Sequence, residues 1–347
     1  MQSRVSTYII RPVIDSVIET RYPLTFRKED AKLLGEHLKL RHSVELVGLK
    51  RVGISDFLRF FLLRRGVVQK YIEKGKFHLF IAVDLNDLVE REVFPFWILT
   101  FKRLADSVEK FNVDPKLKKE IGVLFLSAIQ SQDLFLTTEY LRESLAKVTA
   151  AGVIPTIFFI RFDRIAEILN NEVFSILESL VDASGQKLAY VFTSFRTIDE
   201  VVAKDLDRNF LHVFANICHL KGANFRDTKT IFDTLKKRYH LKVKGNIERK
   251  LIEISGGHVQ YLHLCILVLM QRKDADIEFK DLTKVVLSDE RIRPQSEEIW
   301  ESLRDVEKDV LLKVHQQQTI KVRERGVAKY LWDTGLVLEG ADKPYIF

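Results

Sequence analysis

Cysteine and proline are scarce in this chain of 347 residues, which contains two and seven of them, respectively. Cys218 and Cys265 have no paired spacing and lie in apolar surroundings, so the sequence argues against a disulfide framework or a zinc site. The most apolar run, residues 262–270, is about half as long as a membrane-spanning helix. The first seven residues do not have the form of a signal peptide. We therefore expect reduced core thiols, a cytoplasmic location and no membrane contact.

The composition is that of a folded protein rather than a disordered or fibrous one. Hydrophobic residues make up 46% of the chain and charged residues 30%. The length fits two or three domains, which is enough to bury a substantial core. A net charge of +7 permits contact with phosphate-bearing partners but does not demand it.

A strand, loop and helix unit is predicted near the N-terminus. Residues 29–41 show helical spacing of leucines, and residues 44–47 form a short apolar strand followed by a glycine-bounded loop and a second helical pattern. Three further runs have the length and boundaries of buried parallel strands, with helical stretches such as 96–111 and 139–152 between them: residues 77–85, 152–160 and 187–194. We expect residues 44–47 inside one parallel sheet, near Phe158 and Val191.

After about residue 215 the apolar strand runs stop and helical periodicity replaces them. The pattern predicts an α/β domain with three layers and a mainly parallel sheet, followed by a smaller helical domain and a winged-helix pattern. The predicted boundaries are an N-terminal segment at 1–35, the α/β domain at 36–215, the helical domain at 216–285 and the winged-helix-like domain at 286–347.

The best-defined motif spans Gly48 to Ser55, between a predicted strand and a predicted helix. Its spacing is that of G-x-x-x-x-G-K-[ST], a loop whose backbone N–H groups bind phosphates, whose lysine neutralises them and whose hydroxyl ligates magnesium. Gly48, Gly53 and Ser55 are present, but Ile54 occupies the lysine position. Lys50 and Arg51 lie inside the loop and would supply positive charge. The alternative interpretation is a tight turn that binds no ligand.

Several segments together resemble the archaeal-type branch of the AAA/STAND P-loop ATPases, over most of the chain. Residues 26–34 are similar to the motif that starts the helix before the phosphate loop, and residues 83–88 to the second strand. Residues 158–165 are similar to the Walker B segment. On that alignment the magnesium-orienting Asp has become Ile160, the water-activating Glu has become Arg161, and only Asp163 survives. The resemblance leaves Asp163 more typical of a solvated or helix-capping carboxylate than of a catalytic one.

The resemblance continues to the C-terminal end. Thr193 and Ser194 match the sensor-1 strand end, where a hydroxyl contacts the γ-phosphate, although a capping role fits them equally well. His258 lies in a segment similar to the Gly-Gly-His-Pro element of the helical lid, with Val259 replacing proline, and is interpreted as a capping or surface residue. Residues 300–337 resemble the closing winged helix. Family members usually continue beyond the position of Phe347, so we expect either a clipped wing or a chain that is cut short.

Three functions are compatible with these residues. The first is a P-loop ATPase-like protein that has lost hydrolysis, a pseudo-ATPase with a regulatory or scaffolding role, which would bind ATP or ADP weakly without metal. It would act through a protein partner or self-association. The second is a DNA-binding protein that uses the basic residues 321–332, although six carboxylates between Glu297 and Asp309 oppose it. The third is an active ATPase with a non-standard Walker A motif.

Overall fold

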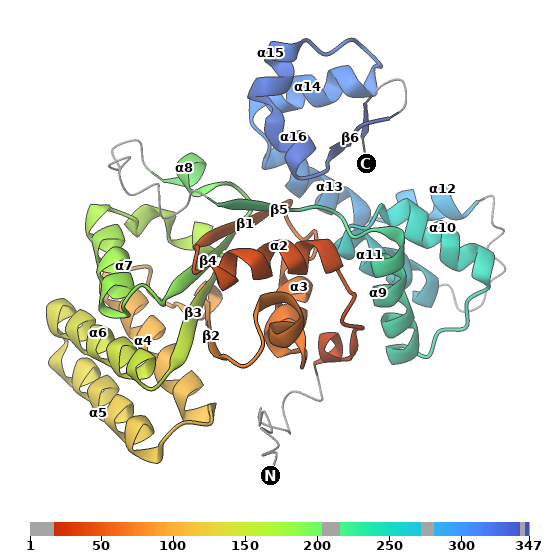
Figure 1. Cartoon of the computed structure of the whole chain (residues 1–347). Helices are drawn as coiled ribbons and strands as arrows, with labels where there is room; N and C mark the ends of the chain where they lie inside the picture. The colour runs from red at the N-terminus through yellow and green to blue at the C-terminus, as the bar shows by residue number, and fades with distance from the viewer. Residues whose placement is uncertain (1–16, 203–215, 272–280, 341–343, 347) are drawn as a thin grey trace. The chain divides into compact units, whose positions relative to one another are not determined.

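The computed structural model describes residues 17–202, 216–271, 281–340 and 344–346 (Figure 1). The chain divides into two compact units. The first consists of residues 1–24, 29–47 and 59–218, and the second of residues 25–28, 48–58 and 219–347.

The sheet has five strands in the order β2-β3-β4-β1-β5. The pairs β1–β4, β3–β4 and β2–β3 are parallel, and Val44 lies opposite Val191. The expected position of residues 44–47 inside the sheet is therefore confirmed. The strands are β1 (Val44–Gly48), β2 (Phe77–Asp84), β3 (Val153–Ile160), β4 (Ala189–Ser194) and β5 (Ile217–Leu220).

The fifth strand corrects the sequence analysis, which ended the strand runs at about residue 215. β5 has only four residues and includes the polar His219, so no apolar run marks it. It is recognisable only from its place at the edge of the sheet beside β1, where the Glu45 N–H donates to the Asn216 carbonyl at 2.9 Å.

Helices cover both faces of the sheet in the first unit. On one face Leu79, Ile81 and Val83 of β2 join a hydrophobic core with residues of α4, α6 and α7. On the other face Phe80 packs against Phe61 and against Phe158 of β3, with ring centroids 6.0 and 5.3 Å apart. The helical elements are η1 (Ile18–Arg21), α2 (Lys28–Lys39), α3 (Ile54–Leu63), η2 (Val68–Ile72), η3 (Leu85–Asp87), α4 (Val93–Lys110), α5 (Pro115–Ser131), α6 (Leu134–Ala150), η4 (Phe162–Ile168), α7 (Asn171–Ala183) and α8 (Ile198–Val201).

Short polar side chains fix where several of these helices begin. Asp114 accepts a hydrogen bond from the Lys116 N–H and precedes Pro115, which suits the first position of a helix. Asp133 and Asn170 cap α6 and α7 in the same manner. The first unit is an α/β structure of three layers, with a mainly parallel sheet between two layers of helices, as the sequence predicts.

The second unit is helical, with one antiparallel two-stranded hairpin. Its helices α9 to α12 form the part that we call the lid. Gly257 has a φ of +84°, and a Cβ there would lie 1.9 Å from the Ala223 carbonyl oxygen, so the turn before α11 requires glycine. The elements are α9 (Phe225–Arg238), α10 (Gly245–Ser255), α11 (Val259–Gln271), α12 (Leu282–Leu287), α13 (Ile292–Glu301), α14 (Asp305–His315), α15 (Val322–Val327), α16 (Lys329–Asp333), β6 (Val337–Leu338) and β7 (Tyr345–Ile346).

The end of the chain is described only in part. Phe347, where the sequence predicts a clipped wing or a chain that is cut short, lies outside the described residues. Within the described helices, none is long and apolar enough to cross a membrane.

Candidate functional site

The predicted phosphate loop connects a buried strand to a helix, as its motif requires. β1 ends at Gly48, and α3 begins at Ile54 with Ser55 in its first turn. Arg51 and Gly53 have φ values of +61° and +117°. Positive φ at position 53 explains the second glycine of the motif, because only glycine adopts that conformation without strain.

Apolar side chains pack against the start of this loop. A Cβ on Gly48 would lie 3.1 Å from Val52 Cγ1 and 3.4 Å from Ile54 Cδ1. Leu49 and Val52 are almost completely buried. The residue at the lysine position therefore turns an alkyl group, rather than an ammonium group, toward the first glycine of the loop.

The beginning of α11 in the lid contacts the loop directly. His258 is fully buried, and its Nε2 lies 2.9 Å from the Lys50 carbonyl oxygen. The Tyr261 N–H donates to Nδ1 of the same ring at 3.4 Å, so Nε2 carries the proton and donates to Lys50. Val259 Cγ2 would lie only 2.5 Å from a Cβ on Gly53.

The environment of His258 keeps the imidazole neutral. Burial lowers its pKa to about 4, the hydrogen bond to Lys50 opposes this effect, and the charge of Arg51 adds to it. The sequence favoured a capping or surface residue, and the bond from Tyr261 supports the first alternative, with the ring buried. Sequence alone could not reveal the burial, because the covering loop lies about 200 positions earlier in the chain.

The two cationic residues of the loop are placed differently. The Arg51 Nε lies 2.9 Å from Glu298 Oε2, and both side chains are partly exposed. Lys50 is half-buried. The charge that Arg51 would offer to a phosphate is therefore shared with a carboxylate of α13.

The segment predicted to resemble Walker B, residues 158–165, begins in β3 and continues beyond the end of this strand at Ile160. Ile160 is the last residue of β3 and lies opposite Asp84 at the end of β2. Arg161, with a φ of +63°, forms an ion pair with Asp84. Each of these side chains is about one-third exposed. Asp163 follows, half-buried, in the first turn of η4.

The positive charge of Arg161 is partly offset by a carboxylate from the neighbouring strand. Asp84 was missed as a partner, although it ends a buried strand and such positions line the carboxyl edge of a parallel sheet.

Thr193 and Ser194 at the end of β4 both bond to the backbone. The Arg161 N–H donates to Thr193 Oγ1 at 2.9 Å, and Ser194 Oγ donates to the Arg196 carbonyl. Both residues are almost fully buried. Both hydroxyls therefore form hydrogen bonds with backbone groups.

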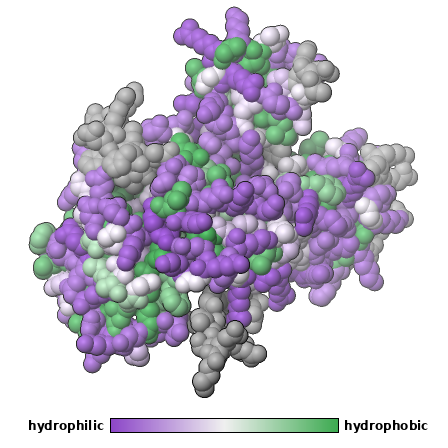
Figure 2. Space-filling model, viewed as in Figure 1, coloured by the Kyte–Doolittle hydropathy of each residue, from purple (hydrophilic) through white to green (hydrophobic). Residues whose placement is uncertain are grey.

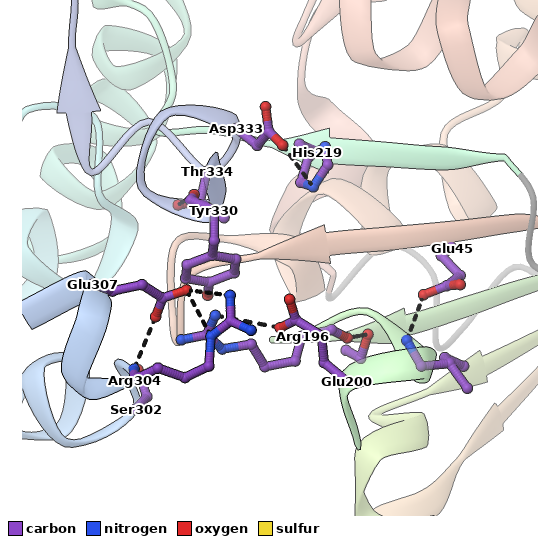
Figure 3. Close-up of polar contacts among 12 residues, drawn as sticks. Glu45, Arg196, Glu200, His219, Ser302, Arg304, Glu307, Tyr330, Asp333 and Thr334 are labelled. Carbon is purple, nitrogen blue, oxygen red and sulfur yellow. Dashed lines mark hydrogen bonds and ion pairs between the residues drawn. The ribbon is translucent and has the colours of Figure 1, made fainter. Parts of the chain in front are cut away.

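A buried glutamate in β1 escaped the sequence analysis. Glu45 is 2% exposed, and its Oε2 accepts a hydrogen bond from the Ile198 N–H at 2.8 Å (Figure 3). Burial raises its pKa to about 8, the bond from Ile198 opposes this, and Asp199 and Glu200 add to it. The signal in the sequence is a single acid in an otherwise apolar strand.

No group of three or more His, Cys, Asp or Glu side chains suited to a metal ion occurs within the part of the chain that the structure describes. Cys218 and Cys265 are buried free thiols, and burial raises their pKa values to about 11 and about 12. Such thiols are poor nucleophiles at neutral pH, because the thiolate is the reactive form.

Comparison with solved structures identifies the fold. The chain is similar to a Walker-type ATPase of Pyrococcus abyssi, with a TM-score of 0.53 and 15% identity over 95% of this chain and 97% of that one. It is also similar to the ORC2 protein of Aeropyrum pernix in ADPNP–ADP complexes, with a TM-score of 0.57 and 10% identity over 95% and 92%. No protein-family model and no curated protein matches the sequence. The shared fold is that of the AAA+ P-loop ATPases.

Proposed function

We propose that this protein uses the P-loop ATPase fold as a regulatory or scaffolding module without hydrolysing ATP. The observation that carries this proposal is the pair of replacements at the two catalytic positions. Ile54 directs an alkyl group toward the first glycine of the loop, and Arg161 forms an ion pair with Asp84. Phosphoryl transfer depends on charge neutralisation by lysine and by a metal ion held by carboxylates.

The ion pair of Arg161 makes a substitute metal site at this edge unfavourable. Asp84 is the nearest carboxylate to the Ile160 position by strand register, and its charge is already engaged by the guanidinium. A magnesium ion would have to displace Arg161 from Asp84, and the displaced guanidinium would then lie close to the metal and repel it. We therefore expect no bound metal.

Nucleotide binding in this proposal is weak and independent of magnesium. Support comes from the loop backbone and from the N-terminus of α3, because N–H groups at a helix start attract an anion whatever side chain occupies position 54. Two contacts oppose nucleotide binding. Val259, the first residue of α11, lies against Gly53, and His258, the residue before it, is hydrogen-bonded to Lys50. ATP or ADP would have to fit beside these contacts.

Turnover and calorimetric titration with ADP, each with magnesium and with a chelator, test the proposal. We expect no magnesium-dependent turnover, and Ile54→Lys should not restore it because the Walker B carboxylates would still be missing. Ile54→Glu should abolish weak ADP binding by placing an anion at the loop, whereas the matched Ile54→Ala should retain it. Gly53→Val is less informative, since its side chain would also collide with Val259.

Two results would overturn this account. One is a steady rate of hydrolysis that Ser55→Ala abolishes, which would support the active ATPase with a non-standard loop. The other is tight ADP binding that requires magnesium.

The remaining assignments are proposals of the same kind. We propose domain boundaries at 36–215, 216–285 and 286–347 after an N-terminal segment, a cytoplasmic location, and action through a protein partner or self-association. The turnover and titration measurements do not depend on these assignments.

DNA binding through a C-terminal winged helix is the second candidate. It is favoured by the exposed basic side chains of Lys321, Arg323 and Lys329 around α15 and α16. Against it, Lys329 lies 3.6 Å from Asp333, and Arg325 pairs with Glu339. Loss of DNA binding in the double variant Arg323→Gln/Lys329→Gln would support this candidate.

A further inference from the structure

One segment of the lid carries a strong local excess of positive charge. Seven of the 15 residues 236–250 are Lys or Arg and one is Glu, so the segment has a net charge of +6, against +7 for the whole chain. We call residues 236–250 the lid basic segment. It lies apart in sequence from both the phosphate loop and the C-terminal helices.

The lid basic segment has a defined conformation. It comprises the last turn of α9, the connection at 239–244 and the first turns of α10. Glu248 joins the two helices, because its Oε2 lies 3.0 Å from Lys236 Nζ and its Oε1 contacts Lys229 of α9. The Leu241 N–H donates to the Lys236 carbonyl at 2.9 Å. The cationic side chains therefore project from a fixed backbone.

Most of these cations have no carboxylate partner. In the described parts of the chain, five side chains of the segment form no ion pair, whereas Lys236 pairs with Glu248 and Arg249 with Glu253. Figure 2 shows a predominantly hydrophilic surface over α9 and α10, at the right of the view. The five are Lys237, Arg238, Lys242, Lys244 and Lys250.

The position of Lys244 adds to this unbalanced charge. Lys244 is the N-cap residue of α10, and its side chain makes no capping hydrogen bond. A cation at a helix N-terminus is electrostatically unfavourable, because that end carries a partial positive charge. An external polyanion would relieve both this repulsion and the repulsion among neighbouring lysines.

An aromatic side chain lies within the cationic group. Tyr239 is 36% exposed, and the Arg238 guanidinium lies 5.8 Å from its ring centroid. Tyrosine is the one large hydrophobic residue exposed in this described segment. Membrane-surface helices need several apolar anchors beside their basic residues, whereas nucleic-acid surfaces combine cations with single aromatic rings that stack on bases.

We propose that the lid basic segment binds the phosphate backbone of nucleic acid, with Tyr239 available to stack on an unpaired base. This surface is separate from the C-terminal winged-helix candidate, and it does not depend on the presence or absence of hydrolysis. It assigns a ligand class to the lid, to which the sequence analysis gave none.

The test measures binding of the full chain to fluorescein-labelled DNA of about 30 nucleotides, single-stranded and duplex, between about 50 and 200 mM salt. The triple variant Lys237→Gln/Arg238→Gln/Lys242→Gln removes three cations. Its matched control, Lys74→Gln/Lys76→Gln/Lys119→Gln, removes three exposed lysines that have no ion-pair partner in the described structure. Circular dichroism melting confirms that both variants are folded.

We expect the lid variant to lose at least tenfold in affinity for duplex DNA, with a log–log salt slope shallower by about 2.7. The control should stay within about twofold of wild type. Tyr239→Ala should weaken single-strand binding more than duplex binding, because stacking needs an unpaired base.

Four results would overturn the inference. They are equal losses in the lid variant and the control, no wild-type binding at about 50 mM salt, binding to phosphatidylserine vesicles but not to DNA, and loss confined to Arg323→Gln/Lys329→Gln. The last result would favour the winged-helix candidate instead. The calorimetric ADP titration remains the separate test of the pseudo-ATPase proposal.

Discussion

In both the sheet and the lid, a buried titratable side chain holds a backbone group. In the sheet, Glu45 accepts a hydrogen bond from the Ile198 N–H. In the lid, His258 donates one to the Lys50 carbonyl. The acid has a raised pKa and the base a lowered one, so both side chains are mostly neutral near pH 7. Burial therefore favours an uncharged hydrogen bond in both places.

The Walker B end shows the opposite solution. Arg161 and Asp84 form an ion pair in which each side chain is about one-third exposed, so solvent screens the interaction. In these three contacts, the two buried titratable side chains form neutral hydrogen bonds, whereas the ion pair lies where solvent reaches it.

The largest expected effect is a pH-dependent loss of stability in the first unit. The pKa of Glu45 is about 8 in the folded protein and about 4.5 when exposed, so the folded state binds the proton more tightly. The stability that this provides is complete below pH 4.5 and is lost as pH rises through 8, by about 5 kcal/mol. Denaturation at pH 6.5 and above isolates this effect from that of His258.

The measurement uses Trp97 fluorescence in a Trp300→Phe/Trp332→Phe background, since Trp97 lies in the core of the first unit. Glu45→Gln keeps an acceptor for the Ile198 N–H and should flatten the pH dependence. An unchanged slope in Glu45→Gln would show that another group is responsible.

The second effect is the reverse pH dependence in the lid. The pKa of His258 is about 4 in the folded protein and 6.5 when exposed, so the folded state binds the proton less tightly. Its contribution is complete above pH 6.5 and is lost as pH falls through 4, by about 3 kcal/mol. Hydrogen exchange of peptides from α11, corrected for the pH dependence of the intrinsic exchange rate, should therefore show reduced protection in acid.

Substitution of the same residue gives a related check at neutral pH. His258→Ala removes the bond to Lys50 and leaves a cavity, at a cost of about 2 kcal/mol. The exposed His315→Ala serves as the control and should change stability by less than about 0.5 kcal/mol. Similar losses for the two variants would contradict the structural role of the buried ring.

The smallest effect is expected at the exposed ion pair. A double-mutant cycle with Asp84→Asn and Arg161→Gln should give a coupling of at most about 1 kcal/mol, because both side chains are partly solvated. The coupling should shrink in about 1 M salt. A coupling energy as large as the stability loss in His258→Ala would show that the exposed ion pair stabilises the protein as much as the buried neutral hydrogen bond does.

Local patterns in the sequence were sufficient to predict the main features of the fold. Four of the five strands follow from apolar runs, and the glycine spacing placed the loop between β1 and α3. The short strand β5 gave no such signal. Its four residues acquire their structure from the neighbouring strand rather than from their own pattern.

The residues of the candidate site stay a prediction from the motif, whereas the partners that they contact were not predicted at all. Ile54 and Arg161 could be identified by position within a motif. The partner of Arg161, Asp84, lies 77 residues earlier, and that of His258 lies 208 residues earlier. Such contacts depend on tertiary structure, which a single sequence does not specify locally.

The contact between α11 and the phosphate loop has a consequence for any ligand of that loop. His258 and Val259 are part of the same chain as Gly53 and Lys50, so they act on the loop at an effective concentration set by the tether. A free nucleotide that needs the same space competes with an intramolecular occupant. Its measured affinity would then report the strength of that occupant as well as its own contacts with the loop.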